Sequence, residues 1–463
     1  MNYLSKLPKM FNPQSVAVVG ASANPEKLGY HVMKSLVHGG YRGHIYPVNP
    51  KSAELWNLPA FPHLDKVPGA VDLAIIVVPS HMVTGVLEQC FKKGVQGIVL
   101  ITAGFGEIED PAGASLQEQV REMANDRSLP IIGPNTFGFV DRHASLNASF
   151  TPEFSLLSTG GISLVSQSGG FCHLSGFRAL DENVGFAKVI GLGNRCNVDF
   201  PDILPYLAHD SDTTVIALYI EGMDNPRRLL EVARQLRGMK PIIAYKAGRG
   251  ERGDSASKFH TGSLAGRYEI YQGAFRQGGI LDVSDTEELL DTAKALDSVT
   301  PLQGNRVAVL SSQAGPGLIA CDICEAHGLR FVEFSPMVQE RIDELLPPLA
   351  IRTNPVDMGP AWYNPTAIIG IMEAVLDDPN IDGVVFLAMY ASANIALAGE
   401  MRKYWEERES LKKPLVACFS APDPIWSEDV QFMDRTKGMV FLPTPERAAR
   451  TMGNLWRLQR LLS

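Results

Sequence analysis

The sequence predicts an α/β protein built on parallel sheets. Short apolar runs of strand length alternate with amphipathic segments of helical spacing along the chain, which is the pattern of parallel α/β folds. At 463 residues the chain is long enough for about three domains, each able to bury a core. Hydrophobic residues make up 45% and charged residues 20%, a mix that excludes a disordered or fibrous chain.

The first set of alternations predicts one doubly wound unit, a first domain over residues 1–147. Its expected strands are Ser15–Val19, His44–Val48, Asp72–Val78, Gly97–Ile101 and Pro130–Ile132. Its expected helices include Met82–Lys93 and Gly113–Met123. The stretch Thr151–Gly161, with two glycines and two serines, is typical of a connection.

Two further sets predict a second domain over residues 148–300 and a third over 301–463. The second has expected strands at Ile162–Val165, Phe186–Ile190, Val215–Ile220, Pro241–Tyr245 and Ile280–Val283, and helices at Gly170–Ala179 and Pro226–Arg237. The third has expected strands at Arg306–Leu310, Gly383–Leu387, Pro414–Cys418 and Met439–Phe441, and a final helix at Glu446–Leu461. Residues 163–169 and 308–315 repeat one pattern, strand, Ser-Gln, small residue, Gly, so both domains open with the same kind of turn.

Charge and hydropathy exclude several classes of protein. Lys plus Arg total 42 and Asp plus Glu total 51, a net charge of −9, which argues against binding to nucleic acid or a membrane surface. No apolar run approaches the ~18 residues of a membrane span, and Met1–Asn12 lacks the apolar core of a signal peptide. The six cysteines are too scattered for a disulfide scaffold. We expect a cytoplasmic protein, and no metal site at the lone C-x-x-C of Cys321 and Cys324.

The first strand-to-helix turn predicts a phosphate-bearing ligand. Gly20 directly follows the first strand, Ser22 lies in the turn, and a helix N-terminus follows. The spacing is not G-x-G-x-x-G, and the second strand ends in Asn49 and Lys51 where NAD sites place an acid. A lysine suits the ribose phosphate of coenzyme A, so a CoA site fits better than NAD. A Rossmann-like turn whose ligand cannot be named is the alternative.

Other strand ends of this sheet carry tight turns. Val78 and Pro79 follow the third strand, Thr102 the fourth and Asn135 the fifth. Open parallel sheets bind ligands at their carboxyl edge, which predicts that these residues contact the same ligand. They could equally be ordinary strand exits.

A second anion site is predicted where the second domain begins. The residues are Ser166, Ser168, Gly169 and Gly170, which follow a strand and open a helix. Free N–H groups at a helix N-terminus bind anions, and hydroxyl groups add donors. Serine is also a common helix N-cap, so a purely structural role is the alternative.

His260 is the candidate nucleophile. It follows the long polar stretch Lys246–Phe259 and precedes an expected helix near Gly262. A neutral histidine can attack phosphorus and form a phosphoramidate, provided that a partner fixes its tautomer. Glu221, at the exit of an apolar strand, is the candidate partner. Any one of ten histidines could instead be structural.

Eight ordered motifs together resemble one family, the α subunit of NDP-forming acyl-CoA synthetases, best known as ADP-forming acetate–CoA ligase and related to succinyl-CoA synthetase. The motifs are Gly20-Ala-Ser, Pro47-Val-Asn-Pro-Lys51, Gly133-Pro-Asn135, Ser166-Gln-Ser-Gly-Gly170, Tyr219-Ile-Glu-Gly222, Lys246-Ala-Gly-Arg249, His260-Thr-Gly-Ser-Leu-Ala-Gly266 and Asn354-Pro-Val-Asp357. The resemblance implies a Rossmann-like CoA-binding domain followed by two flavodoxin-like domains.

The resemblance also implies a mechanism. Acyl-CoA, ADP and phosphate give acid, ATP and CoA reversibly, through an acyl phosphate and a phosphohistidine at His260. Glu221 steadies that histidine, and the Ser166–Gly170 turn cradles the phosphate. ADP or ATP with Mg²⁺ is expected on an ATP-grasp module, here a separate β subunit in an α2β2 assembly. The main alternative is a non-catalytic CoA-binding regulatory protein; a protein acyltransferase and a nicotinamide oxidoreductase fit less well.

Overall fold

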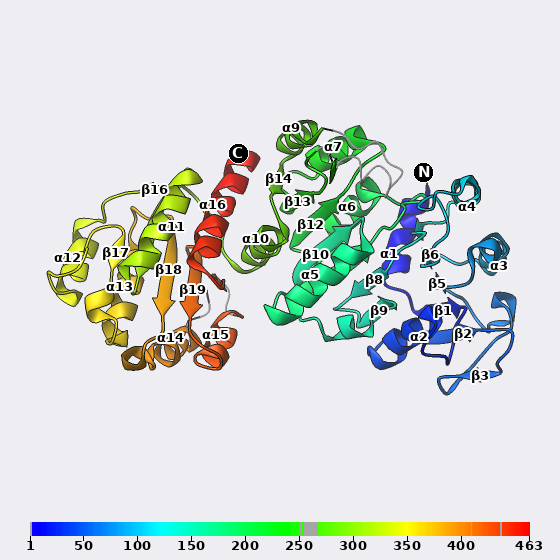
Figure 1. The fold of residues 1–463 in the computed structure, drawn as a ribbon, viewed down its shortest axis with the longest axis horizontal. Helices are drawn as coiled ribbons and strands as arrows, with labels where there is room; N and C mark the ends of the chain where they lie inside the picture. The colour runs from blue at the N-terminus through cyan, green and yellow to red at the C-terminus, as the bar shows by residue number, and fades with distance from the viewer. Residues whose placement is uncertain (1, 251, 254–266, 409, 436–437) are drawn as a thin grey trace. The chain divides into compact units, whose positions relative to one another are not determined.

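The computed structural model describes residues 2–250, 252–253, 267–408, 410–435 and 438–463. The chain forms two compact units, Met1–Ser284 and Asp285–Ser463 (Figure 1). Both are α/β units with mainly parallel sheets, as the sequence predicts. Among the described residues no helix is long and apolar enough to cross a bilayer.

The first unit begins with a five-stranded parallel sheet in the order β2-β1-β5-β6-β7. Its strands and helices lie close to their predicted positions, and every residue of β1, β5, β6 and β7 is buried. The elements are α1 (Leu7–Phe11), β1 (Ser15–Val19), α2 (Leu28–His38), β2 (His44–Val48), β5 (Leu73–Ile76), α3 (Val83–Lys93), β6 (Gly97–Leu100), α4 (Pro111–Asp126) and β7 (Ile131–Ile132). A short ladder of β3 (Glu54–Leu55) and β4 (Leu58–Pro59) follows β2.

Local signals set the ends of these helices. Gly94 ends α3 in the left-handed conformation, and Asp110 caps α4 by accepting from the Ala112 N–H, with Pro111 in the first turn. Because both helices connect neighbouring parallel strands, their ends bring the strand exits to one edge of the sheet.

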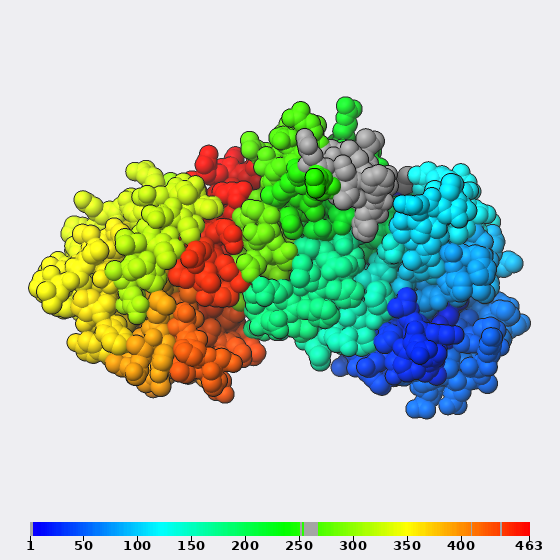
Figure 2. All heavy atoms as spheres, viewed as in Figure 1, coloured from blue at the N-terminus to red at the C-terminus, as the bar shows by residue number. Residues whose placement is uncertain are grey.

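A seven-stranded sheet in the order β14-β13-β12-β10-β11-β8-β9 completes the first unit. Helix α5 lies over the strands of this sheet in the ribbon view (Figure 1), and the green and teal atoms of this part of the chain form a continuous surface in the space-filling view (Figure 2). The elements are β8 (Gly138–Asp141), β9 (Leu146–Ser149), β10 (Thr159–Ser166), α5 (Gly169–Asp181), β11 (Phe186–Gly191), α6 (Phe200–His209), β12 (Val215–Ile220), α7 (Pro226–Gln235), β13 (Ile242–Lys246), α9 (Tyr268–Gly278) and β14 (Ile280–Val283).

The β8–β9 hairpin lies at the predicted end of the first domain, residue 147. The hairpin pairs antiparallel with β11 and so belongs to the second sheet. Lys188 of β11 is 1% exposed and contacts Asp141 of β8 at 3.1 Å and Asp210 at 2.8 Å. Burial lowers the pKa of Lys188, but the two carboxylates outweigh it and hold that pKa above its ordinary value. A charged cluster therefore fastens the hairpin to this sheet.

The second unit contains a parallel sheet in the order β16-β15-β18-β19-β20, with β17 paired to β15. Helices lie on both faces of the sheet (Figure 1). The elements are α10 (Thr286–Ser298), β15 (Arg306–Ser311), α11 (Ala314–Ala326), β16 (Arg330–Phe331), α12 (Pro336–Leu345), β17 (Val356–Asp357), α13 (Pro365–Asp377), β18 (Gly383–Met389), α14 (Leu397–Glu406), β19 (Leu415–Ser420), α15 (Ser427–Met433), β20 (Met439–Phe441) and α16 (Pro445–Leu462).

Helix α10, which the predicted second domain includes, packs within the second unit. Its Asp291 accepts two hydrogen bonds from buried Arg447 of α16, at 2.8 and 2.6 Å. Lys294 contacts Asp434 at 2.6 Å. Two buried ion pairs over long sequence separations thus attach α10 to the unit that begins at Asp285.

Candidate active site

The predicted CoA-binding residues gather at the carboxyl edge of the first sheet. Because all five strands run parallel, their exits share this edge. The residues at those exits are Gly20 after β1, Asn49 and Lys51 after β2, Val78 and Pro79 after β5, Thr102 after β6 and Asn135 after β7.

Two glycines let the helix approach the first turn. Gly20 has a φ of 98°, and a Cβ on it would lie 2.8 Å from the Val77 carbonyl oxygen. A Cβ on Gly29, in the first turn of α2, would collide with the carbonyl oxygen of Gly20. The N-terminus of α2 thus sits against the turn, where a phosphate could reach backbone N–H groups.

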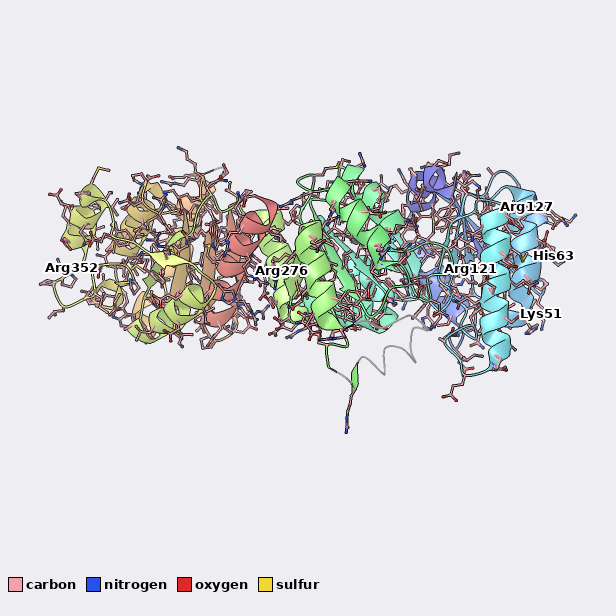
Figure 3. The ribbon with its side chains drawn as sticks, turned by 90° about the horizontal axis from the view of Figure 1, so that it is seen from above. Lys51, His63, Arg121, Arg127, Arg276 and Arg352 are labelled. Carbon is pink, nitrogen blue, oxygen red and sulfur yellow. The ribbon has the colours of Figure 1, made fainter. Side chains whose placement is uncertain are left out.

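Most polar side chains near the β1–α2 turn form hydrogen bonds to neighbouring backbone groups. The Asn49 amide donates to Ala21 O at 2.8 Å and its oxygen accepts from Lys51 N at 2.8 Å. The Ser22 hydroxyl is buried and accepts from Asn24 N at 3.0 Å. Lys51 is exposed at the surface of the first unit (Figure 3). Asn49 and Ser22 therefore shape the turn, and Lys51 is an exposed cation just after the end of β2.

A polar network joins the two sheets of the first unit. Thr102 donates to Val78 O at 2.7 Å, and Glu107 accepts from the N–H groups of the same loop. Asn194, after β11, donates to Glu107 at 2.5 Å and accepts from Asn135 at 3.3 Å. Sequence reasoning missed Glu107 and Asn194, because neither stands in a recognisable motif.

The turn between β10 and α5 has the geometry of an anion site. The Ser166 hydroxyl donates to Ser168 O at 2.8 Å and accepts from Ser168 N at 3.1 Å. Ser168 caps the helix by accepting from Phe171 N at 3.3 Å. Gly169 and Gly170 form the first turn, where N–H groups have no acceptor within the helix. The serines are thus N-cap and turn residues, and the free donors come from the glycine backbone.

Glu221 stands at the exit of β12, where it is 8% exposed. Tyr219, two residues earlier on the same strand, stacks on Phe171 of α5 with ring centroids 3.8 Å apart. Burial, and next the charge of Glu221 and a hydrogen bond to it, raise the pKa of Tyr219 above its ordinary value. The phenol therefore stays protonated and donates to the Glu221 carboxylate.

A cavity of about 420 Å³ brings these parts together. Its described lining includes Ser168, Gly169, Gly170, Glu221 and Asn135 from the predicted set. The other predicted first-sheet residues and Ser166 are not among the described lining residues. New members of the lining are Leu28, Ile101, Ala103, Thr136, Phe137, Phe150, Gln167, His173, Gly193 and Asn194. His260 lies outside the described residues.

One wall of the cavity is aromatic and uncharged. His173 packs against Phe137, Phe150 and Phe154, and one of its ring nitrogens is 2.6 Å from the Thr151 hydroxyl. Burial lowers the pKa of His173, more strongly than a hydrogen bond to Gly169 O raises it. The described lining includes no Lys or Arg, and Glu221 is its sole carboxylate. An anion here would be held by neutral donors.

The described residues were also compared with the requirements of a metal site. Among the described residues, no group of three or more His, Cys, Asp or Glu side chains is placed to hold a metal ion. Cys321 is partly exposed and Cys324 buried, and burial raises the pKa of the Cys321 thiol to about 11.

Family models match three consecutive segments of the chain. They describe a CoA binding domain over residues 14–142, a succinyl-CoA ligase like flavodoxin domain over 159–296 and a ligase-CoA domain over 307–460. The ADP-forming acetate–CoA ligase II subunit alpha of Pyrococcus furiosus is 39% identical, over 83% of this chain and 82% of its own. The corresponding subunit alpha of isoform I is 36% identical, over 97% of both chains.

The chain belongs to the family of ADP-forming acetate–CoA ligase α subunits. A solved structure agrees: acetyl-coenzyme A synthetase 1 of Ca. Korarchaeum cryptofilum, in complex with phosphate and ADP, superposes with a TM-score of 0.90 at 33% identity, covering 98% of this chain and 97% of that one. The predicted family, fold class and enzyme class, an ADP-forming acid–CoA ligase, are confirmed, and the catalytic interpretation is favoured over a regulatory one. Because the relatives are named α subunits, a partner subunit is implied.

Proposed function

We propose that this chain performs the acyl-transfer and phosphohistidine steps of an ADP-forming acyl-CoA synthetase. The observation that carries the proposal is the cavity, where a helix N-terminus, the carboxylate of Glu221 and Asn135 of the CoA-binding edge meet. Neutral N–H donors for a phosphate, an acid to orient a histidine and a route to a thioester are the parts that this chemistry needs.

The first chemical step uses groups from both sheets of the first unit. Coenzyme A binds the carboxyl edge of the first sheet, with Lys51 and the Gly20 turn on its phosphates. A phosphate oxygen in the cavity attacks the thioester carbon, the C–S bond breaks, and the thiolate leaves and takes a proton. The product is an acyl phosphate beside the N-terminus of α5, whose dipole and N–H groups stabilise its oxyanions.

His260 then takes the phosphoryl group and releases the acid. Glu221 accepts the hydrogen bond of the other imidazole nitrogen, so that the attacking lone pair faces phosphorus. Tyr219, which is stacked on Phe171, hydrogen-bonds to Glu221 and helps to hold its carboxylate in place. The phosphohistidine passes its phosphoryl group to ADP, bound with Mg²⁺ on an ATP-grasp β subunit in an α2β2 assembly. Water exclusion and positioned donors account for most of the rate.

The test is transfer of label from phosphate to the chain. The purified chain is incubated with acetyl-CoA and radiolabelled phosphate. Wild type is expected to carry acid-labile, base-stable label, His260→Ala none, and Glu221→Gln much less. His143→Ala, at an exposed histidine outside the cavity, is the matched control and keeps the label. Equal labelling of His260→Ala would refute the phosphohistidine.

The partner is tested separately. The chain alone is expected to make no acyl-CoA from acid, ATP and CoA, because the nucleotide module is proposed to lie on the β subunit. Adding a purified ATP-grasp subunit restores turnover. Sustained ATP-dependent turnover by the isolated chain would contradict the division of labour.

A further inference from the structure

Gln167 occupies the junction of the anion-binding turn and the strand that carries Glu221. It lies between β10 and α5, is 5% exposed, and lines the cavity. Its own N–H donates to Tyr219 O at 3.2 Å, so its backbone continues the pairing of β10 with β12. The side chain is therefore held in place beside the reacting groups.

The two ends of this amide face different partners. Its oxygen accepts from the N–H groups of Glu221 at 2.8 Å and Gly222 at 3.1 Å. Because both of these groups are donors, they fix the oxygen on the side of β12 and the nitrogen on the other side. The backbone of Glu221 is thus fastened to the anion-binding turn by one side chain.

The nitrogen of the same amide lacks a partner. Nε2 of Gln167 is buried, yet it makes no hydrogen bond among the described residues. A buried amide N–H₂ without an acceptor is costly and rare in proteins, unless a ligand supplies the acceptor. The described cavity lining has no Lys or Arg, so an anion there relies on neutral donors such as this one.

We propose that Gln167 is a catalytic residue whose Nε2 donates a hydrogen bond to an oxygen of the phosphate that attacks the acyl group and is then transferred. The inference deepens the proposed function by adding a donor to the glycine N–H groups of α5. The amide links two tasks: its oxygen sets the position of Glu221, and its nitrogen binds the anion. No covalent step at Gln167 is involved.

The experiment separates the two ends of the amide. Gln167→Glu keeps an acceptor for the N–H groups of Glu221 and Gly222 but loses the donor and adds a negative charge. Gln167→Met loses both ends without adding charge. The exposed Gln313 offers a matched control, Gln313→Glu, which makes the same chemical change on the turn of the second unit.

Binding of inorganic phosphate to the purified chain is measured by calorimetry, together with phosphate-dependent release of the CoA thiol from acetyl-CoA. We expect both Gln167 variants to bind phosphate at least about 10-fold more weakly and to have a raised KM for phosphate. Gln313→Glu stays as wild type. Melting temperatures of the variants test whether each of them is folded.

Wild-type affinity for phosphate in a folded Gln167→Met variant would overturn the donor role and leave only a positioning role. Failure of the proposed function looks different, because then wild type itself would release no thiol with phosphate. If Gln167→Met does not fold, the Gln167→Glu variant decides, since it retains the acceptor. Wild-type affinity for phosphate in Gln167→Glu would likewise overturn the proposal.

Discussion

The turn before α5 and the turn before α11 have the same backbone construction and different chemistry. Ser311 donates to Gln313 O at 2.5 Å and accepts from Gln313 N at 3.4 Å, as Ser166 does with Ser168. Ser312 then corresponds to Gln167: its hydroxyl accepts from Met389 N at 3.0 Å. In each unit, the side chain of the residue directly after the strand accepts a hydrogen bond from the backbone N–H at the end of the neighbouring strand.

Strand register makes the correspondence complete. Ser166 pairs with Tyr219 and Ser311 with Leu387, so Glu221 and Met389 occupy equivalent positions. The first turn has an acid and an amide with a spare donor, whereas the second has a thioether and a hydroxyl. The shared scaffold therefore provides the turn and its helix N-terminus, and two side chains distinguish the proposed phosphoryl-transfer site from the turn of the second unit.

The largest effect on activity is expected from replacing Glu221 by the residue at the equivalent position of the second turn. Glu221→Met gives the first turn the residue of the second and removes the carboxylate that we propose orients His260. Phosphoryl transfer, measured as label incorporated from acetyl-CoA and radiolabelled phosphate, is expected to fall by about 100-fold or more. Phosphate binding should change little, because the N–H donors remain. Met389→Leu, at the equivalent place in the second unit, is the control and should incorporate as much label as wild type. Wild-type labelling of Glu221→Met would show that Glu221 is not part of the mechanism.

The positions of several candidate site residues in the fold were predictable from sequence because these residues follow strand exits. The bounds of β1, β2, β12 and β14 agree exactly with apolar runs, and Glu221 and the Ser166–Gly170 turn follow from them. Gln167 escaped notice because the repeated Ser-Gln pattern aligns it with Gln313. Hydrogen bonding shows that the equivalent residue is Ser312, one position earlier.

The domain borders depended on contacts that local patterns do not record. The four residues of β8 are all buried, so they lack the alternation that would show a strand with one exposed face. The contact between Lys188 and Asp141, which are far apart in the sequence, helps to hold β8 in the second sheet. Helix α10 is likewise attached by an Asp291–Arg447 pair separated by 156 positions.

A second contrast is between the proposed anion site before α5, whose described lining has no Lys or Arg, and the β1–α2 turn. Both present a helix N-terminus, but only the β1–α2 turn has an exposed cation, Lys51, beside it. We expect Lys51→Glu to weaken CoA binding by about 1 to 3 kcal/mol, with the loss shrinking at high salt. Titration calorimetry of CoA measures it, with Lys66→Glu as an exposed control. Affinity unchanged by Lys51→Glu would place the CoA phosphates elsewhere.

The structural nature of the second turn predicts a smaller effect. Ser312→Ala leaves the N–H of Met389 without its acceptor, which is expected to cost about 1 to 3 kcal/mol of unfolding free energy. Chemical denaturation should show the loss in the transition of the second unit, while phosphate binding stays at the wild-type level. Ser392→Ala, at an exposed serine after β18, serves as control. A matching loss of phosphate affinity in Ser312→Ala would show that the second turn also binds the anion.

The smallest expected effect is on the pH dependence of stability, and it comes from a difference between helices α5 and α11. His173 of α5 corresponds to Leu318 of α11, which is 57% exposed, and burial lowers the pKa of His173 in the folded protein. The unfolded histidine titrates near ~6.5, so below that pH the unfolded chain binds the proton first and stability falls until the lowered folded pKa is reached. In His173→Leu this contribution is absent, and unfolding free energy should depend less on pH in that window. Denaturant unfolding of both proteins, between neutral pH and the acidic side of 6.5, measures the difference. Parallel curves would mean that His173 is protonated equally in both states, and that the aromatic wall does not keep it neutral.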